Sequence, residues 1–423
     1  MESATGTSAP VEQRPITETE NQPEFPEIAR ARKILNANFG NYTAIIENLK
    51  SEGILPESID WVQKDLEMKM PEASFLEASD YEMMFVLRLF HPETYEHSIR
   101  TYLTGKEKIL SNHPVGEYLR RKITEEIPEG NALEVVYRSL LLHDMGKIAV
   151  PVFILDDTHT DANWASLGEE HCLQHSEGKQ GICYEAKLEE AKETNPSARY
   201  KDVVPIKYGY KLEPEKIEII NKFGGNLPKG YEEYAYTSDA PLGKIVEIHP
   251  AISAAVLESA GKHIEAQIVR EHHASEASPE QKKYPTASGA LFFSKSLASV
   301  VHAADFMDAL LSPRSYKGAL GLFLTLSKLS EEAVNKTLPK ELADLWIDAD
   351  IDQFRNEMDT VFEQAQLTTE ERARIGGSLN YYISKLPPKQ QEGERKFMKD
   401  ILDQFRPRHT KDGGEPSNDR RKI

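Results

Sequence analysis

Residues 140–151 read LLLHDMGKIAVP and end an apolar run whose helical spacing covers residues 133–148. His143 and Asp144 are adjacent at the end of this run, Gly146 can terminate a helix, and Lys147 follows. Burying two such polar side chains is unfavourable unless something pairs with them, and a metal ion is the obvious candidate. The alternative interpretation of this motif alone is a helix C-terminus with polar capping residues.

The apolar spacing of the remaining chain is also mostly helical, with apolar residues at three- and four-residue steps. Strand-like alternation is scarce, and no internal repeat of about 20 to 50 residues is present. The sequence therefore predicts an all-α fold. The expected helical segments are residues 28–49, 81–103, 133–148, 252–273, 294–311, 341–346, 354–365 and 370–383.

The expected organisation is a central helical domain with additions on both sides. Polar composition predicts disordered tails at the two ends, because such segments bury too little apolar surface to offset ordering. The helical preface and the C-terminal extension are candidates for dimerisation or partner binding. The expected boundaries are a tail at 1–24, a preface at 25–80, the central domain at 81–325, an extension at 326–405 and a polar tail at 406–423.

Residues 156–241 differ from the rest of the central domain. They are rich in Gly, Lys, Glu and Tyr, and their hydrophobic period is weak. This composition predicts a mixed insertion, with a short strand pair and one helix, that forms a surface excursion. His171, Cys172, His175 and Cys183 lie in it, and they are either ordinary loop residues or ligands of a structural zinc, although their spacing matches no common zinc finger.

Charge and cysteine usage exclude several classes of protein. The 423 residues carry a net charge of −18, from 69 acidic and 51 basic residues, which argues against nucleic-acid polymers and anionic membranes as partners. A small anionic substrate fits only if positive charge is concentrated locally, for instance by metal ions. Two cysteines exclude a disulfide scaffold, and neither a secretory signal nor an apolar run of membrane-spanning length is present. These features predict a soluble, cytoplasmic protein.

Four further segments place histidine or aspartate at helix ends or on apolar helix faces. His97 lies on the edge of an apolar helix face, and His249 directly precedes a proline at an expected helix start. His272 and His273 end another apolar helix, and Asp305 lies within an apolar helix where an unpaired carboxylate would be very unfavourable. Together with His143 and Asp144, these residues are the inventory of a two-metal site in which an aspartate bridges two cations.

No phosphate-binding loop, dinucleotide fingerprint or nucleophilic-serine motif is present. Instead, the order of the histidine and aspartate motifs resembles the HD-domain phosphohydrolase superfamily, and specifically its HD-GYP branch, over roughly residues 80–325. The segments that carry the resemblance are HSIRT at 97–101, HDMGKIAVP at 143–151, IHPAISAAVL at 248–257, EHH at 271–273 and AADFMDALLSPRSYKGAL at 303–320.

The chain departs from the HD-GYP pattern at three places. Ala274 follows the paired histidines where the family usually has glutamate, and Lys283 stands where glycine precedes Tyr284 and Pro285. The interval from the His-Asp pair to the next histidine is also lengthened by the insertion. The metal ligands are unaffected, whereas the loop on the substrate side is altered, so the substrate class stays open.

The resemblance implies a role for each matching residue. One metal would be held by His97, His143, Asp144 and Asp305, and a second by Asp144 as the bridge together with His249, His272 and His273. Glu93 would be a ligand of a third metal or, alternatively, an exposed residue of a first helical turn. Asp144 and Lys147 would be the catalytic residues; Lys147, Arg314, Lys317 and Tyr284 would contact the substrate; and Asp308 would orient a ligand histidine.

A histidine-rich shell favours divalent iron or manganese, with zinc or cobalt as alternatives. The implied function is a phosphodiesterase that cleaves cyclic di-GMP or a related cyclic dinucleotide with a metal-activated water. Two alternatives remain. One is an HD phosphohydrolase acting on a mononucleotide or another phosphate ester, and the other is a degenerate domain that only binds a ligand or a partner protein.

Overall fold

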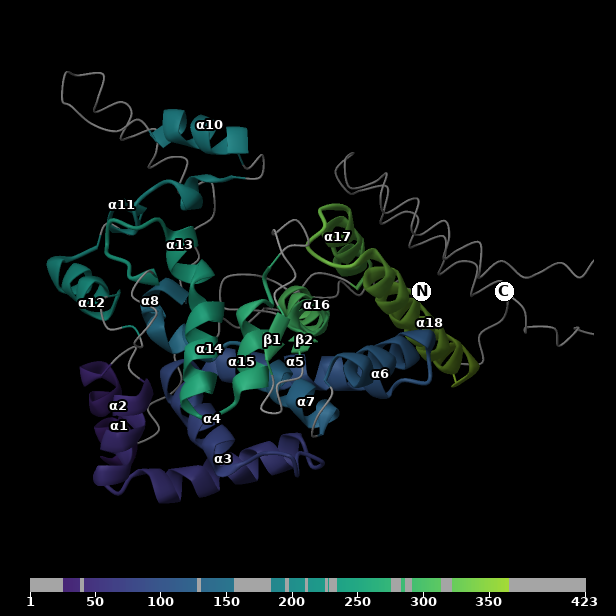
Figure 1. Cartoon of the computed structure of the whole chain (residues 1–423), viewed down its shortest axis with the longest axis horizontal. Coiled ribbons are helices and arrows are strands. Elements are labelled where there is room, and N and C mark those ends of the chain that lie inside the picture. Colours follow the sequence, from purple (N-terminus) through teal and green to yellow (C-terminus); the bar gives the residue numbers. More distant parts are fainter. Residues whose placement is uncertain are drawn as a thin grey trace, which may run out of the picture.

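Helix α7 (Ala132–Leu142), which leads into the His-Asp pair, lies among the central helices of the computed structural model (Figure 1). Residues 140–142 are fully buried, as expected for a core helix that ends in the motif. The structure describes residues 26–38, 42–127, 131–155, 184–194, 198–209, 212–224, 227, 234–274, 283–285, 291–312 and 322–364.

The described chain is predominantly helical, which confirms the predicted all-α class at that level. Its helices before the insertion are α1 (Pro26–Ala37), α2 (Tyr42–Ser51), α3 (Leu55–Lys69), α4 (Ala78–Phe90), α5 (Pro92–Leu110), α6 (Pro114–Glu126), α7, the 3-10 helix η1 (Met145–Ala149) and α8 (Val152–Leu155). After the insertion come α13 (Leu242–Glu247), α14 (His249–Ser259), α15 (His263–Arg270), α16 (Ser294–Leu311), α17 (Leu322–Val334) and α18 (Lys340–Gln364). Two short antiparallel strands, β1 (Lys283–Pro285) and β2 (Leu291–Phe293), precede α16.

The predicted preface and extension pack on the same hydrophobic core as the central helices. Leu49 of α2, Leu140 of α7 and Trp346 of α18 are all fully buried members of one cluster. A buried ion pair of 2.5 Å between Lys108 and Asp350 also joins α5 to α18. The flanking helices therefore stabilise the central bundle directly.

Several helices that the periodicity predicted as continuous are broken where the chain turns. The expected helix 81–103 is two helices, because α5 starts at Pro92 and the His91 side chain accepts a hydrogen bond from the backbone N–H of Thr94. The expected helix 252–273 is interrupted by Gly261, whose φ of 78° suits glycine. By contrast, α16 has the bounds that the sequence predicted.

The described part of the insertion is helical and partly buried, which corrects the prediction of a surface excursion. It contains α10 (Tyr184–Thr194), the 3-10 helix η2 (Tyr200–Asp202), α11 (Ile206–Gly209) and α12 (Pro214–Gly224), whereas the expected strand pair is absent from these residues. Ile206 and Ile220 are fully buried in a second hydrophobic cluster with Ile252 of α14. The Tyr236 hydroxyl also donates a hydrogen bond to the carbonyl oxygen of Ala149 in η1.

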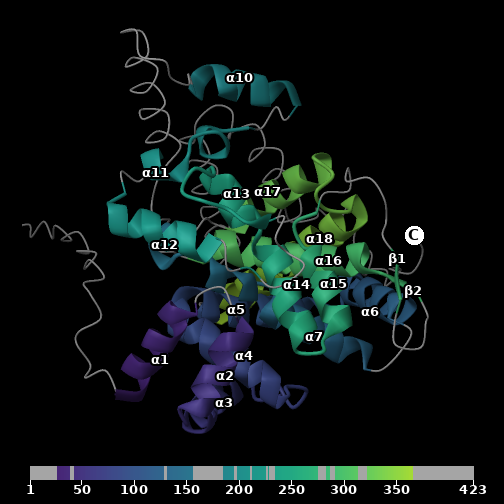
Figure 2. The ribbon, with the colours of Figure 1, turned by 60° about the vertical axis from the view of Figure 1, so that its left-hand side comes forward.

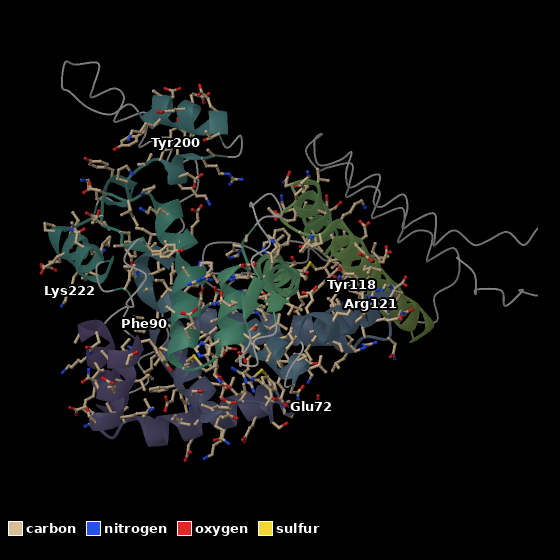
Figure 3. All side chains as sticks on the ribbon, viewed as in Figure 1. Glu72, Phe90, Tyr118, Arg121, Tyr200 and Lys222 are labelled. Carbon is tan, nitrogen blue, oxygen red and sulfur yellow. The ribbon has the colours of Figure 1, made fainter. Side chains whose placement is uncertain are left out.

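The insertion covers one side of the bundle. Helices α10 and α3 lie at opposite ends of the molecule in both views of the ribbon (Figure 1 and Figure 2). Tyr200 of η2 lies beside α10, far from Glu72, in the view with all side chains (Figure 3).

None of the helices in the described ranges has both the length and the apolar character needed to cross a bilayer.

The terminal tails, the helix expected at 370–383 and the residues His171, Cys172, His175, Cys183, Arg314 and Lys317 lie outside the described residues, as does the side chain of Tyr284.

Candidate metal centre

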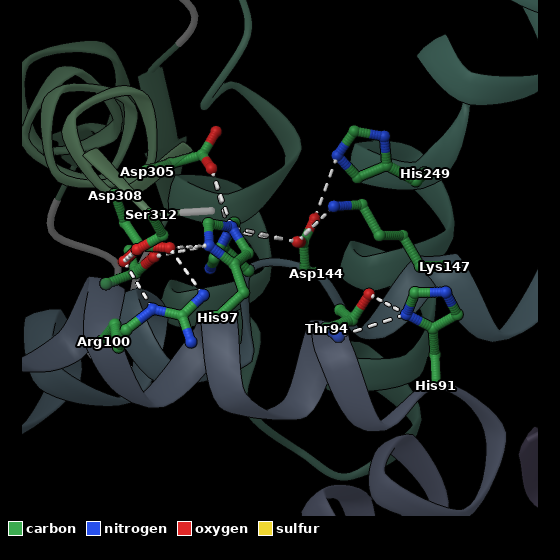
Figure 4. A network of polar contacts seen from close by, with 12 residues as sticks. His91, Thr94, His97, Arg100, Asp144, Lys147, His249, Asp305, Asp308 and Ser312 are labelled. Carbon is green, nitrogen blue, oxygen red and sulfur yellow. Dashed lines mark hydrogen bonds and ion pairs between the residues drawn. The ribbon is translucent and has the colours of Figure 1, made fainter. Parts of the chain in front are cut away.

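Five helical elements bring the predicted metal ligands together in the interior of the bundle. His97 comes from α5, the His143–Asp144 pair from the junction of α7 and η1, and His249 from the first turn of α14. His272 and His273 follow α15, and Asp305 comes from α16. Residues up to 208 positions apart in the chain thus meet at one place, part of which is drawn in Figure 4.

One half of the cluster consists of His97, His143 and Asp305. Their ligand atoms all lie within 4.8 Å of one another. The Nε2 atom of His97 lies 2.9 Å from Oδ1 of Asp305, and that of His143 lies 3.7 Å from the same oxygen. These are the residues that the sequence assigned to a first metal, apart from Asp144.

The other half consists of His249, His272 and His273, whose ligand atoms also lie within 4.8 Å of one another. The rings of the last two are adjacent, with centroids 4.0 Å apart. His273 differs from the other site histidines because 41% of its side-chain surface is exposed. It therefore lies on the side of the cluster that is open to solvent.

Asp144 lies between the two halves and directs one carboxylate oxygen toward each. Its Oδ2 is 3.4 Å from Nε2 of His97 and 3.4 Å from Nε2 of His143, whereas its Oδ1 is 3.3 Å from Nε2 of His249 (Figure 4). This is the arrangement expected of a carboxylate that bridges two cations.

Backbone carbonyl groups fix the tautomer of three site histidines. The Nδ1 atoms of His143, His249 and His272 lie 2.9, 2.5 and 2.6 Å from the carbonyl oxygens of the residues three positions earlier, Leu140, Val246 and Val269. A carbonyl oxygen can only accept, so each Nδ1 carries the hydrogen and each Nε2 carries the lone pair. Metal-binding histidines usually hydrogen-bond through the other ring nitrogen in this way.

The Nε2 atoms of these three histidines provide the test of whether the cluster fits a metal. They are buried, and they make no hydrogen bond with any residue that the structure describes. Leaving buried lone pairs without a partner is costly, and so is placing carboxylates beside them. A cation between the imidazoles and the carboxylates removes both costs, so the residues present fit divalent metal ions.

Burial and neighbouring charge set the protonation of the cluster. Burial lowers the pKa of His249 to about 3, and it lowers the pKa of His272 well below the usual histidine value. Burial also acts to lower the pKa of His143, but the carboxylates of Asp144 and Asp305 raise that pKa above the usual histidine value. Burial alone would raise the pKa of Asp144, but the Lys147 ammonium and the surrounding imidazoles hold that pKa well below its usual range. Neutral imidazoles and an ionised carboxylate are the forms that bind metals.

Gly146 allows η1 to approach α14 closely enough to form the cluster. A Cβ atom at this position would lie 2.0 Å from the carbonyl oxygen of His249 and 2.7 Å from the backbone nitrogen of Ser253. The Gly146 N–H instead donates a 2.6 Å hydrogen bond to the Ser253 hydroxyl. Helix α7 has already ended at Leu142, so the glycine serves close packing and is not the helix terminator that the sequence suggested.

Lys147 lies beside the bridging carboxylate, with its Nζ atom 2.5 Å from Oδ2 of Asp144. It also lines a cavity of about 590 Å³ that reaches His97 and Glu93. Glu93 is exposed in the first turn of α5 and belongs to none of the metal-ligand groups formed by the described residues. Its role as a third-metal ligand stays a prediction.

Asp308 contacts His97, one of the predicted metal ligands, as the sequence predicted. Its Oδ2 lies 2.5 Å from Nδ1 of His97, and its two oxygens accept hydrogen bonds from Nε and Nη2 of Arg100 at 2.7 and 3.2 Å. Ser312 donates a further hydrogen bond of 2.7 Å (Figure 4). The sequence analysis missed Arg100, although its position three residues after His97 places it on the same helix face.

His302 is a second residue that the sequence analysis missed. Its ring lies 5.6 Å from that of His273, in an edge-to-face arrangement, and its Nε2 is 3.4 Å from Oε2 of Glu332 on α17. His302 lies three residues before Asp305 on α16, a spacing that places both on one face of the helix. This spacing was the only signal available in the sequence.

Comparisons with known proteins give no independent assignment, because no protein-family model, no curated protein and no solved structure matches the chain.

Proposed function

We propose that the protein is a metal-dependent phosphohydrolase of the HD type that hydrolyses a phosphodiester bond, with cyclic dinucleotides such as cyclic di-GMP as the first substrate class. The observation that carries this proposal is the position of Asp144 between two groups of histidines whose Nε2 atoms face inward. A pair of divalent cations, when bound, activates water and offsets charge on a phosphate. Action on a cytoplasmic nucleotide is part of the same proposal.

The candidate residues would have different roles at such a site, either binding a cation or contacting the phosphate. The first group, with Asp144 and Asp305, would hold one cation, and His249, His272 and His273 would complete the shell of the other. Lys147 would place its ammonium beside a non-bridging phosphate oxygen, since it adjoins Asp144 and lines the cavity. The positive potential would be confined to this centre, which reconciles an anionic substrate with the net charge of −18.

A second candidate within the same superfamily is hydrolysis of a mononucleotide or another phosphate ester. The substitutions Ala274 and Lys283 in the loop on the substrate side favour keeping this candidate. A degenerate binding domain is disfavoured, because buried lone pairs on three histidines are costly to keep without a cation.

The experiment combines metal analysis with a substrate panel. Purified protein, loaded with Mn²⁺ or Fe²⁺ under reducing conditions, is assayed on cyclic di-GMP, a second cyclic dinucleotide, GMP and 4-nitrophenyl phosphate, with Asp144→Asn as the control. Metal-dependent hydrolysis of a cyclic dinucleotide that the control lacks is the expected result. Turnover of only GMP or the monoester favours the second candidate, and a metal-loaded protein that hydrolyses nothing contradicts both.

A further inference from the structure

We infer that the cavity beside the metal centre binds the part of the substrate that is not hydrolysed, and that Lys201, from the insertion, binds a second anionic group there. This inference rests on the proposed function and deepens it, because it assigns the substrate to the class of nucleotides with two separate phosphates.

The cavity joins the metal centre to the insertion. His97 and Lys147 of the candidate centre line it, and so does Lys201 of η2. Its volume of about 590 Å³ lies within the range of about 300–1,000 Å³ that is usual for small-molecule sites. A single phosphate group would leave most of this space unfilled, so a larger ligand is expected.

One wall of the cavity is aliphatic. It is formed by Ile154 and Leu155 of α8 and by Leu242 and Val246 of α13, on either side of the insertion in the sequence. Ile154 is almost fully buried, which anchors this wall in the second hydrophobic cluster. Aliphatic lining of this kind suits an apolar ring face such as that of a nucleobase.

Most of the charged groups that line the cavity are already paired within the protein. Lys147 pairs with Asp144 and Arg100 with Asp308, while Glu96 accepts a 2.5 Å hydrogen bond from Lys69. Within the described ranges, by contrast, no carboxylate lies within 4.0 Å of the Lys201 ammonium, and its acidic neighbour Glu247 interacts with it only at longer range.

Among the described residues that line the cavity, the Lys201 ammonium is therefore the cation without a close carboxylate partner, and it can bind an anionic ligand. Glu93 lines the same cavity, and its carboxylate would repel a second phosphate group placed beside it. The contact with phosphate is accordingly assigned to Lys201 and its surroundings, on the insertion side of the cavity.

The backbone that carries Lys201 is held by packing. The N–H of Arg199 donates a 2.8 Å hydrogen bond to Oδ2 of Asp202, which closes η2. A Cβ atom on Gly243 would lie 2.5 Å from Oδ1 of Asp202, so η2 rests directly on α13. The neighbouring Val204 is fully buried. Lys201 thus projects from a supported turn rather than from a long free loop.

The test compares Lys201→Ala and Lys201→Arg with Lys192→Ala. Lys192 is a matched control, because it belongs to the same insertion, pairs with the exposed Glu189 on α10 and does not line the cavity. KM and kcat are measured on cyclic di-GMP and on bis(4-nitrophenyl) phosphate, which lacks a second phosphate. Equilibrium binding of cyclic di-GMP and of GMP to the full-length protein is measured in parallel, with metal content as a check.

We expect Lys201→Ala to raise KM for cyclic di-GMP by about tenfold to a hundredfold, the range of one charge-assisted hydrogen bond. Both kcat and the hydrolysis of the nitrophenyl diester should change less than about twofold. Lys201→Arg should restore most of the affinity, and Lys192→Ala should behave as the unmutated protein. Equal losses on both substrates, or no loss on cyclic di-GMP, would overturn the inference.

The binding measurement separates this inference from the proposed function. If the protein binds cyclic di-GMP in a Lys201-dependent manner but hydrolyses nothing, the assignment of Lys201 to an anionic group of the ligand stands and the phosphohydrolase assignment fails. If the protein hydrolyses the nitrophenyl diester but does not bind cyclic di-GMP, or binds it no more tightly than GMP, the assignment stands and the inference fails.

Discussion

His97 and Asp308 lie 211 positions apart in the sequence, yet Nδ1 of the histidine donates a 2.5 Å hydrogen bond to Oδ2 of the aspartate. On its other side, Nε2 of the same ring faces the carboxylates of Asp144 and Asp305 at 3.4 and 2.9 Å. A ring with carboxylates on both sides is stabilised by positive charge near Nε2. A metal cation bound there would supply that charge, and Asp308 would then hold the ring in the required orientation.

The first prediction follows from this relationship. Asp308→Asn keeps the shape of the side chain but removes its charge, so the His97 ring should be held less firmly. Removing such an outer partner typically lowers metal affinity by about 10- to 100-fold. Competition with a chelator of known affinity measures the effect. The control is Ser312→Ala, which removes only one hydrogen bond to Asp308 and should change affinity far less. An unchanged affinity in Asp308→Asn would show that the ring is positioned by packing alone.

The second prediction concerns the close contact between η1 and α14. Gly146→Ala should destabilise the protein by about 1–3 kcal/mol, because the added methyl group meets backbone atoms that have to move apart. That movement should also separate Asp144 from His249 and lower metal content. Urea unfolding and metal analysis measure the two effects.

Gly261→Ala is the control for this substitution. Its Cβ would enter open space, but its φ of 78° makes alanine cost about 1–2 kcal/mol. It should therefore reduce the free energy of unfolding without reducing metal content. If both variants lose metal in proportion to stability, the loss in Gly146→Ala reflects general destabilisation and not local geometry.

The third prediction is that the two halves of the cluster lose metal independently. The unmutated protein should bind about two equivalents of a first-row transition metal per chain. His249→Ala should retain about one equivalent, and Asp144→Ala should lose both, because its oxygens face both halves. His263→Ala is the control, since this exposed histidine at the start of α15 lies outside the cluster. Full metal content in Asp144→Ala would rule out a bridging role.

The fourth prediction separates catalysis from metal binding. Lys147→Met should lower kcat/KM for bis(4-nitrophenyl) phosphate by about 10- to 100-fold, because a charged contact to phosphate is lost. Metal affinity should be unchanged or higher, since the variant removes a positive charge 2.5 Å from Asp144. Parallel kinetics and chelator competition test this. A fall in metal affinity would assign Lys147 a structural role instead.

The sequence predicted the residues of the cluster better than the shapes of the elements that carry them. His249 was placed at a helix start by the proline that follows it, and α14 does begin there. Asp308 was expected to orient a ligand histidine, and the hydrogen bond to His97 is present. Such local rules work because the polar residues interrupt clear apolar patterns, and burying them without partners is costly.

Long-range packing accounts for most of what the sequence did not predict. The need for glycine at position 146 depends on α14, which is more than one hundred residues away in the chain. The hydrophobic period of the insertion did not predict the burial of Ile206 and Ile220. These residues pack in a core shared with α14 and η1, and the insertion forms no long periodic helix of its own in the described residues. The hydrophobic period predicts individual helices and strands, but it does not predict which of these elements pack against one another.

Anomalous X-ray diffraction from crystals of the protein loaded with Mn²⁺ or Fe²⁺ would locate the bound cations themselves. We expect two anomalous peaks about 3.5–4 Å apart, the usual separation in two-metal sites, with the Asp144 carboxylate between them. One peak should be bound by His97, His143 and Asp305, and the other by His249, His272 and His273. A single peak, or no peak among these residues at full metal loading, would contradict the assignment of a two-metal centre.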